Sequence, residues 1–318
     1  MKNYVLLVYL LVIIVSFPIS LLAQNQLYAP DTVIRYALIG KDTVNKQPLS
    51  KEIYLFDYKF RLKEKSLFTW NVSEKQWQKS KKFELSYYPT EILVNCYDIE
   101  GKNQQIQSQR ILIQLDKQAN IIEVSLQRKD RYTEKFSLVE KKNYKYQQDT
   151  LKQSLYYRMI NQLTLEKEVN YLYTKNLVVE KEVVYNQSGQ ELSKNQRKIE
   201  LKGRDVIRVQ TMESSFPKDT IIEKFEYSDR LLSKKLTSLV CSSKVKSNHQ
   251  HKIVYPFQVQ FFYDKEGNLL SELYRKLDKE NLVRADRENR LVEWVYSTKT
   301  PYSTDKLKLN PKVNDFLN

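Results

Sequence analysis

Side chains that commonly carry metal or catalytic chemistry are scarce in this sequence. Its only histidines, His249 and His251, are two residues apart; on a strand they would share a face and could hold a metal with a third ligand. The polar residues around them favour an exposed loop, so we expect no metal and no cofactor. Without a Gly-x-Ser-x-Gly or Gly-x-Gly-x-x-Gly motif, we expect no catalytic residue. A glycan hydrolase with two carboxylates is the enzymatic alternative, because acids from distant strands leave no local spacing.

The cysteines and tryptophans suggest cross-linking or binding. In an oxidising compartment Cys96 and Cys241 could form one long-range disulfide, or they could be two separately buried thiols. Trp70, Trp77 and Trp294 could form a platform for sugar rings. Cross-strand aromatic pairs that hold a sheet in register are the favoured interpretation.

Four Asp-Thr-apolar triplets, at residues 31–33, 42–44, 149–151 and 219–221, resemble the O-glycosylation sequence that some Gram-negative bacteria use on exported proteins. Asp-Thr also commonly begins strands after turns, and this second interpretation is favoured. Both interpretations are compatible with export.

The first 23 residues predict export. Lys2 is followed by an apolar run, Pro18 interrupts it, and Ala23 provides a small residue for cleavage, which is the order of a signal peptide. An uncleaved anchor is the alternative. No later segment is apolar for long enough to span a bilayer, so we expect no membrane span after cleavage. The expected location is the periplasm, the outer envelope surface or the extracellular space.

Composition favours sheets with one dry and one wet face. The chain has 318 residues, with 23 Tyr but only 5 Gly, and 41% of its residues are hydrophobic. The formal charge of +15 would favour anionic polysaccharide or envelope proteins as partners. Nucleic acid is a weaker candidate, because an exported protein rarely meets it.

Hydrophobic residues recur with a period of two, as strands require. Phe257, Val259, Phe261 and Tyr263 would share one face, opposite Gln258 and Gln260. Turn signals of one type separate such runs: an aromatic residue would close the strand, Asp or Asn would cap the turn, and Gly would accept a positive φ. These predicted structural turn residues are Tyr97, Asp98 and Gly101; Tyr185, Asn186 and Gly189; and Tyr263, Asp264 and Gly267.

These turns, above all the one at residues 263–269, make residues 50 to 300 resemble the Tyr-Asp repeat family, also called RHS-type repeats. The resemblance implies consecutive β-hairpins and carries a fold rather than an activity.

The predicted fold is therefore all-β, with extended antiparallel sheets of consecutive hairpins, and two packed or curled sheets are one arrangement of them. The expected segments are a signal peptide (1–23), an N-terminal hairpin region (24–143), an uncertain connection (144–176), a C-terminal hairpin region (177–300) and a polar tail (301–318). The connection could be strands or one helix, and strands are favoured. The predicted function is that of an exported, non-enzymatic scaffold or binding protein. The alternatives are the hydrolase and a periplasmic lipid or lipoprotein carrier. The sequence leaves the oligomeric state open.

Overall fold

The computed structural model describes residues 28–101, 104–203, 205–213, 220–228, 231–240, 256–278, 280, 282–284, 288–297 and 300–301. Its elements are strands throughout: β1 (Tyr28–Ala29), β2 (Thr32–Leu38), β3 (Lys46–Phe56), β4 (Leu62–Asn71), β5 (Gln76–Tyr87), β6 (Glu91–Glu100), β7 (Gln104–Leu115), β8 (Ile121–Lys129), β9 (Phe136–Gln147), β10 (Thr150–Met159), β11 (Leu163–Tyr173), β12 (Leu177–Tyr185), β13 (Glu191–Lys202), β14 (Asp205–Glu213), β15 (Thr220–Ser228), β16 (Leu231–Val240), β17 (Phe257–Tyr263), β18 (Leu269–Lys276), β19 (Arg290–Val295) and β20 (Thr300–Pro301). Among the described residues, no helix is long and apolar enough to cross a membrane.

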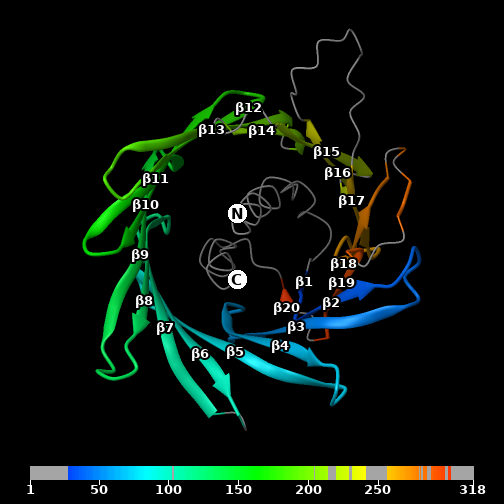
Figure 1. Ribbon diagram of the computed structural model, residues 1–318, viewed down its shortest axis with the longest axis horizontal. Helices are drawn as coiled ribbons and strands as arrows, with labels where there is room; N and C mark the ends of the chain where they lie inside the picture. The colour runs from blue at the N-terminus through cyan, green and yellow to red at the C-terminus, as the bar shows by residue number, and fades with distance from the viewer. Residues whose placement is uncertain are drawn as a thin grey trace.

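The strands form one closed antiparallel barrel. Strands β2 to β19 pair in chain order, and β19 returns to pair with β2, with Trp294 opposite Val33 (Figure 1). The all-β antiparallel prediction is confirmed. The possibility of two packed sheets is wrong, because the first and last strands of the wall pair with each other and leave one sheet without edges.

The segment that the sequence left undecided, residues 144–176, belongs to this wall. It contains the end of β9, all of β10 and all of β11. Ser154 of β10 pairs with Tyr144 on one side and with Val169 on the other. The favoured prediction of strands is confirmed, and β10 pairs with β9 and β11 with one register shift on each side.

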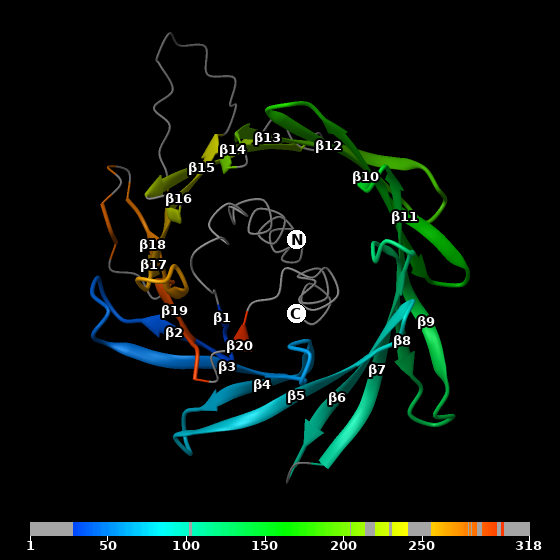
Figure 2. The same cartoon turned by 180° about the vertical axis from the view of Figure 1, so that it is seen from behind.

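The register divides the side chains into two faces, because directly paired residues project to the same side. One face is the more buried: Phe83 pairs with Cys96, Val94 pairs with Ile111, and all four are at most 7% exposed. Among the described strands only β1 and β20 are not part of the wall, and both views place them inside the ring (Figures 1 and 2). No described element therefore covers the wall from outside. Because side chains converge on the concave side of a closed wall, the buried face is the inner face.

Apolar packing is concentrated on the inner face of β4 to β8. Its buried members are Leu62, Phe83, Leu85, Ile92, Val94, Cys96, Ile111, Ile113, Leu115, Ile121 and Val124. A smaller cluster joins Ile199, Val206, Val209 and Phe225 on β13 to β15. A third cluster, Leu38, Leu273 and Leu291, lies on the outward side near the seam, because Leu273 and Leu291 alternate with inward Glu272 and Val292. Elsewhere the inner face mixes buried apolar residues with buried charges, and these charges form the candidate site.

Candidate functional site

The inner wall carries a belt of buried charges near the seam where β19 meets β2. Glu52 of β3 accepts hydrogen bonds from the guanidinium of Arg35 and the hydroxyl of Tyr54. Its second oxygen, Oε2, lies 3.1 Å from Nζ of Lys65, which is only 1% exposed. Burial by itself would raise the pKa of Glu52, but Lys65 and Arg35 outweigh it and lower that pKa to about 2. Glu52 is therefore held as a carboxylate between two cations.

Glu272 of β18 occupies the same belt in a different state. Its side chain is buried, and the Tyr274 hydroxyl donates a hydrogen bond to Oε2 at 2.5 Å. Burial raises the pKa of Glu272, even though Tyr274, Arg35 and Lys235 all favour its charged form. The belt thus holds one firmly ionised carboxylate, Glu52, and one carboxyl that is inclined to accept a proton.

Further ion pairs continue this belt along neighbouring strands. They are Lys235 with Glu223, Arg197 with Glu180 at 3.0 Å, and Lys167 with Glu182 at 2.8 Å. In each pair the cation is at most 6% exposed. Each charge faces an opposite charge on the adjacent strand. Removal of either partner would leave a buried charge unpaired, and these paired carboxylates differ from a catalytic carboxyl poised to donate a proton.

The outer face is polar at the same strands whose inner face is apolar. Five consecutive strands place polar side chains directly opposite one another: Glu64 of β4, Glu84 of β5, Asn95 of β6, Arg110 of β7 and Gln127 of β8.

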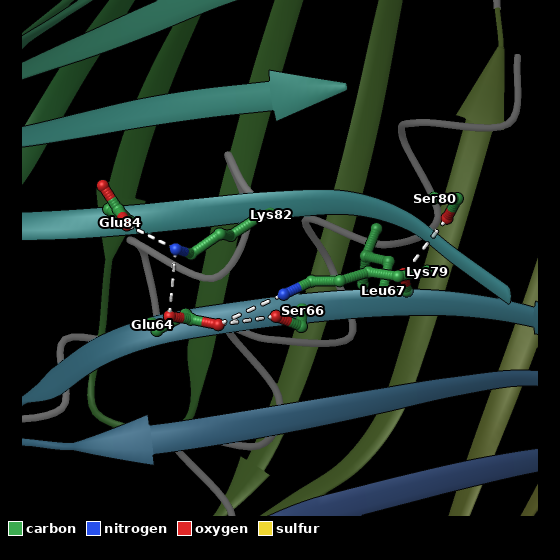
Figure 3. Close-up of polar contacts among 7 residues, drawn as sticks. All are labelled: Glu64, Ser66, Leu67, Lys79, Ser80, Lys82 and Glu84. Carbon is green, nitrogen blue, oxygen red and sulfur yellow. Dashed lines mark hydrogen bonds and ion pairs between the residues drawn. The ribbon is translucent and has the colours of Figure 1, made fainter. Parts of the chain in front are cut away.

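Close contacts link this outer row. Lys82 bridges Glu84 at 2.6 Å and Glu64 at 3.5 Å, and Lys79 also lies 3.5 Å from Glu64 (Figure 3). Arg110 donates from Nε to Gln127 at 2.6 Å. The row is therefore a cross-strand ladder of charges and amides.

A second outer feature is a diagonal of cations on β12 to β15. Lys181 of β12 pairs with Gln196 of β13, two residues before Lys198. Arg208 of β14 pairs with Lys224 of β15. Lys181 and Lys224 are exposed. We call Lys181, Lys198, Arg208 and Lys224 the cationic diagonal. One acid of the described residues, Glu200, contacts the cationic diagonal at a distance of 3.6 Å from Arg208.

The structure separates the three tryptophans. Trp70 and Trp77 pair directly and meet edge to face, with their centroids 5.0 Å apart. Lys51 lies over the Trp77 ring on the same outer face. Trp294 projects to the inner face of β19, in register with Val33 of β2. A shared platform of all three is therefore ruled out by geometry, whereas Trp70 and Trp77 form the cross-strand pair that was favoured.

Of the remaining candidate residues, the cysteines and histidines, the structure describes only Cys96. Cys96 is a buried free thiol of β6, and burial raises its pKa to about 12. Cys241, His249 and His251 lie outside the described residues. Among the residues that are described, no three His, Cys, Asp or Glu side chains gather closely enough to hold a metal.

The three predicted turn motifs occupy different positions. Tyr263, Asp264 and Gly267 join β17 to β18, and Asp264 accepts the backbone N–H of Asn268 at 2.7 Å. Asn186 and Gly189 join β12 to β13, and Asn186 accepts the N–H of Gln190 at 2.9 Å. Because consecutive antiparallel hairpins alternate in direction, these two turns lie at opposite ends of the barrel.

The third motif was predicted wrongly. Tyr97 and Asp98 lie within β6, where they pair with Gln107 and Ile106, and only Gly101 follows the strand. A bulge at Cys96 and Tyr97 lets the ladder continue past the Tyr-Asp pair.

Comparisons with known proteins assign no family. No family model and no curated protein matches the chain. A porin-like protein from Bacteroides uniformis ATCC 8492 aligns over 84% of this chain and 97% of its own, with 8% identity and a TM-score of 0.46. A porin-like protein from Bacteroides vulgatus ATCC 8482 aligns over 86% and 100%, with 10% identity and a TM-score of 0.37. A protein of unknown function from Bacteroides fragilis NCTC 9343 aligns over 38% and 91%, with 18% identity and a TM-score of 0.35. Since each of these three TM-scores is below 0.5, function is argued below from the wall itself.

Proposed function

We propose that this protein is an exported, non-catalytic barrel that stands in water and binds anionic partners, either envelope proteins or anionic glycans. The observation that carries the proposal is the presence of charge on both faces of one closed wall. It supports a water-exposed scaffold more strongly than a barrel embedded in lipid.

The outer face argues for water because of its charges. In lipid, each Lys or Arg on the outside of a barrel costs roughly 2–4 kcal/mol at the bilayer midplane. Five cations project outward from the middle parts of their strands: Lys82, Arg110, Lys141, Lys181 and Lys198. The inner face is no more suited to contact with lipid, because Lys65, Lys167 and Arg197 lie on it.

The inner ion pairs support a scaffold. A barrel of this many strands is too wide for its wall side chains to fill. The paired charges of the belt give such a wall cross-strand contacts that do not depend on a filled core. Because the protein carries a net positive charge, it should attract anionic partners. We assign the cationic diagonal as the outer surface that contacts such a partner.

The location is tested by fractionating the cells that produce the protein. We expect the mature chain in the periplasmic or secreted fraction, soluble without detergent. Recovery only after detergent extraction of the outer membrane would overturn the proposal.

The partner class is tested with a sulfated dextran as a probe anion. We expect binding that weakens as salt is raised, and that falls at least tenfold in Lys181→Glu/Lys198→Glu. The matched control is Lys79→Glu/Lys141→Glu, two charge reversals at outer lysines already paired with Glu64 and Glu123. Equal binding by the diagonal variant and the control would remove the assignment of the diagonal.

The enzymatic alternative is supported by one feature of the inner face: the carboxyl of Glu272 is buried against the Tyr274 hydroxyl, and burial raises its pKa. A hydrolase would use such a carboxyl as its general acid. Glycan hydrolysis that is lost in Glu272→Gln would replace the scaffold proposal with this one.

A further inference from the structure

The four Asp-Thr-apolar triplets differ in one respect that sequence could not show, namely whether the threonine lies in a paired strand or in an exposed loop. Thr32 lies in β2 and pairs with Val295 on one side and Ile53 on the other. Thr150 is the first residue of β10, and its hydroxyl contacts the carbonyl of Gln148 at 3.4 Å. Thr220 pairs with Met212 on β14. These three threonines lie in paired strands and are only partly exposed.

Thr43 is different because it lies in the loop between β2 and β3. All residues from Lys41 to Gln47 are exposed, and the neighbouring Val44 is 81% exposed. Asp42 turns its own carboxylate onto the backbone N–H of Val44 at 3.3 Å, which arranges the triplet as a local turn.

The base of this loop is held while its tip is left open. Ile39 donates its N–H to the carbonyl of Asn45 at 2.9 Å, which closes the hairpin below the triplet. Asn289, which is 0% exposed, donates to the carbonyl of Gly40 at 3.2 Å, and Arg275 donates to the carbonyl of Lys41. The tip is therefore presented away from the wall by a fixed stem.

We infer that Thr43, the one threonine of the four triplets that lies in an exposed loop, is a site of O-linked glycosylation. The hydroxyl oxygen of Thr43 forms a bond to the anomeric carbon of a sugar carried on a phosphate donor. The bond between that carbon and the phosphate oxygen breaks, and the phosphate leaves with the electron pair. The hydroxyl proton passes to a base of the transferring enzyme. The inference concerns the β2–β3 loop and is independent of what the barrel binds.

The test is mass spectrometry on full-length protein purified from the bacterium that encodes it. Trypsin cuts after Lys41 and Lys46, so the acceptor lies in the short peptide Asp42–Lys46. We expect this peptide to carry added carbohydrate mass, located on Thr43 by fragmentation that preserves the glycan. The peptides that contain Thr32, Thr150 and Thr220 should be unmodified.

Three variants complete the experiment. Thr43→Ala should remove the added mass from the intact protein, and Thr43→Ser should retain it because the hydroxyl is kept. Asp42→Ala should lose the modification although the acceptor hydroxyl is still present, which a nonspecific reaction at an exposed threonine would not predict. An unmodified 42–46 peptide in the wild-type protein, or carbohydrate on any of the other three threonines, would overturn the inference.

Discussion

At the scale of single residues, the inner belt stabilises the barrel through a carboxylate that is shared by two cations. Removing one partner of a buried pair leaves the other charge unsatisfied, which costs more than an exposed pair ever contributes. Glu52 is the most consequential member, because Arg35, Tyr54 and Lys65 all bind it.

We predict that Glu52→Gln lowers the free energy of unfolding by about 3–5 kcal/mol, because Lys65 would stay buried without a carboxylate. Urea denaturation followed by circular dichroism measures this. The control is Asp98→Asn, whose pair with Lys81 is 3.9 Å long and largely exposed, and which should change stability by less than about 1 kcal/mol. Equal effects of the two variants would show that the belt does not act as described.

The same residue predicts a pH dependence. The folded-state pKa of Glu52 is lowered to about 2, so its contribution is present above the ordinary carboxyl pKa near 4.5 and is lost as pH falls towards 2. The stabilities of the wild type and of Glu52→Gln should therefore converge between pH 4.5 and 2. A constant difference over that range would contradict the assigned ion pair.

At the scale of elements, one kind of turn recurs where strands reverse. Asp57, Asp116, Asn186 and Asp264 each accept a backbone N–H from the fourth residue onward. The third residue onward has a positive φ in each turn: Phe60, Ala119, Gly189 and Gly267. Two of these positions therefore carry a side chain in a conformation that favours glycine.

We predict that Ala119→Gly leaves the free energy of unfolding unchanged or raises it by up to about 1 kcal/mol, since the φ of 61° would no longer strain a Cβ. Gly189→Ala should lower stability by a similar amount, because a Cβ there meets no atom within 4 Å and only the φ of 80° opposes it. Thermal unfolding measures both changes. Destabilisation by Ala119→Gly would show that this turn is held by something other than its Asx cap.

Tyrosine hydroxyls also recur, at the ends of odd-numbered strands. Tyr87, Tyr227, Tyr263 and Tyr296 each donate to a carbonyl at the start of the preceding strand, at Leu62, Val206, Leu232 and Leu269, over distances of 2.8 or 2.9 Å. Burial raises the pKa of Tyr87 and Tyr263 well above the ordinary value. Each bond therefore ties a strand end to the beginning of the strand before it.

We predict that Tyr263→Phe costs about 0.5–1.5 kcal/mol, the usual net value of such a bond, with more if the Leu232 carbonyl is left unsatisfied. Tyr58→Phe is the control, because Tyr58 is 83% exposed and should tolerate the change. Denaturant unfolding compares the two. Equal stabilities would mean that the hydroxyl bonds do not contribute to hairpin docking.

At the scale of the whole molecule, closure makes the barrel one continuous hydrogen-bonded unit. Strand β19 joins β2 across more than 250 residues of sequence, and no edge separates the predicted N-terminal and C-terminal regions. Such a wall should lose its structure cooperatively.

We predict a single unfolding transition. In Trp294→Phe, fluorescence reports on Trp70 and Trp77 in the N-terminal half; in Trp70→Phe/Trp77→Phe, it reports on Trp294 near the C-terminal end of the wall. Within each variant, the fluorescence midpoint in urea should coincide with that of circular dichroism. Separate midpoints would instead support two independently folding regions, 24–143 and 177–300.

Much of this architecture is local and was readable from sequence. Alternation predicted strands such as β17, where inner Val259 is buried between outer Gln258 and Gln260. Asx residues followed by Gly indicated reversals, because side-chain capping and a positive φ are properties of a few adjacent residues. The failure at Tyr97 and Asp98 shows the limit of this reasoning, since a bulge can carry a strand past a turn signal.

The candidate site was not predictable in the same way. Glu52 and Lys65 looked like solvated strand residues, and nothing local distinguishes them from exposed ones. One signal was present: in 64–65, 81–82, 141–142 and 180–182, neighbouring positions are both charged, so both faces of the strand must be polar.

Sequence alone determined the period of two and the order of the hairpins, because each depends on residues within a few positions of one another. Tertiary structure alone decided that the last strand of the wall pairs with the first, and therefore which face is inner and which ion pairs are buried. Those outcomes depend on the accumulated twist and register of all the intervening strands, to which every hairpin contributes and which no single segment encodes.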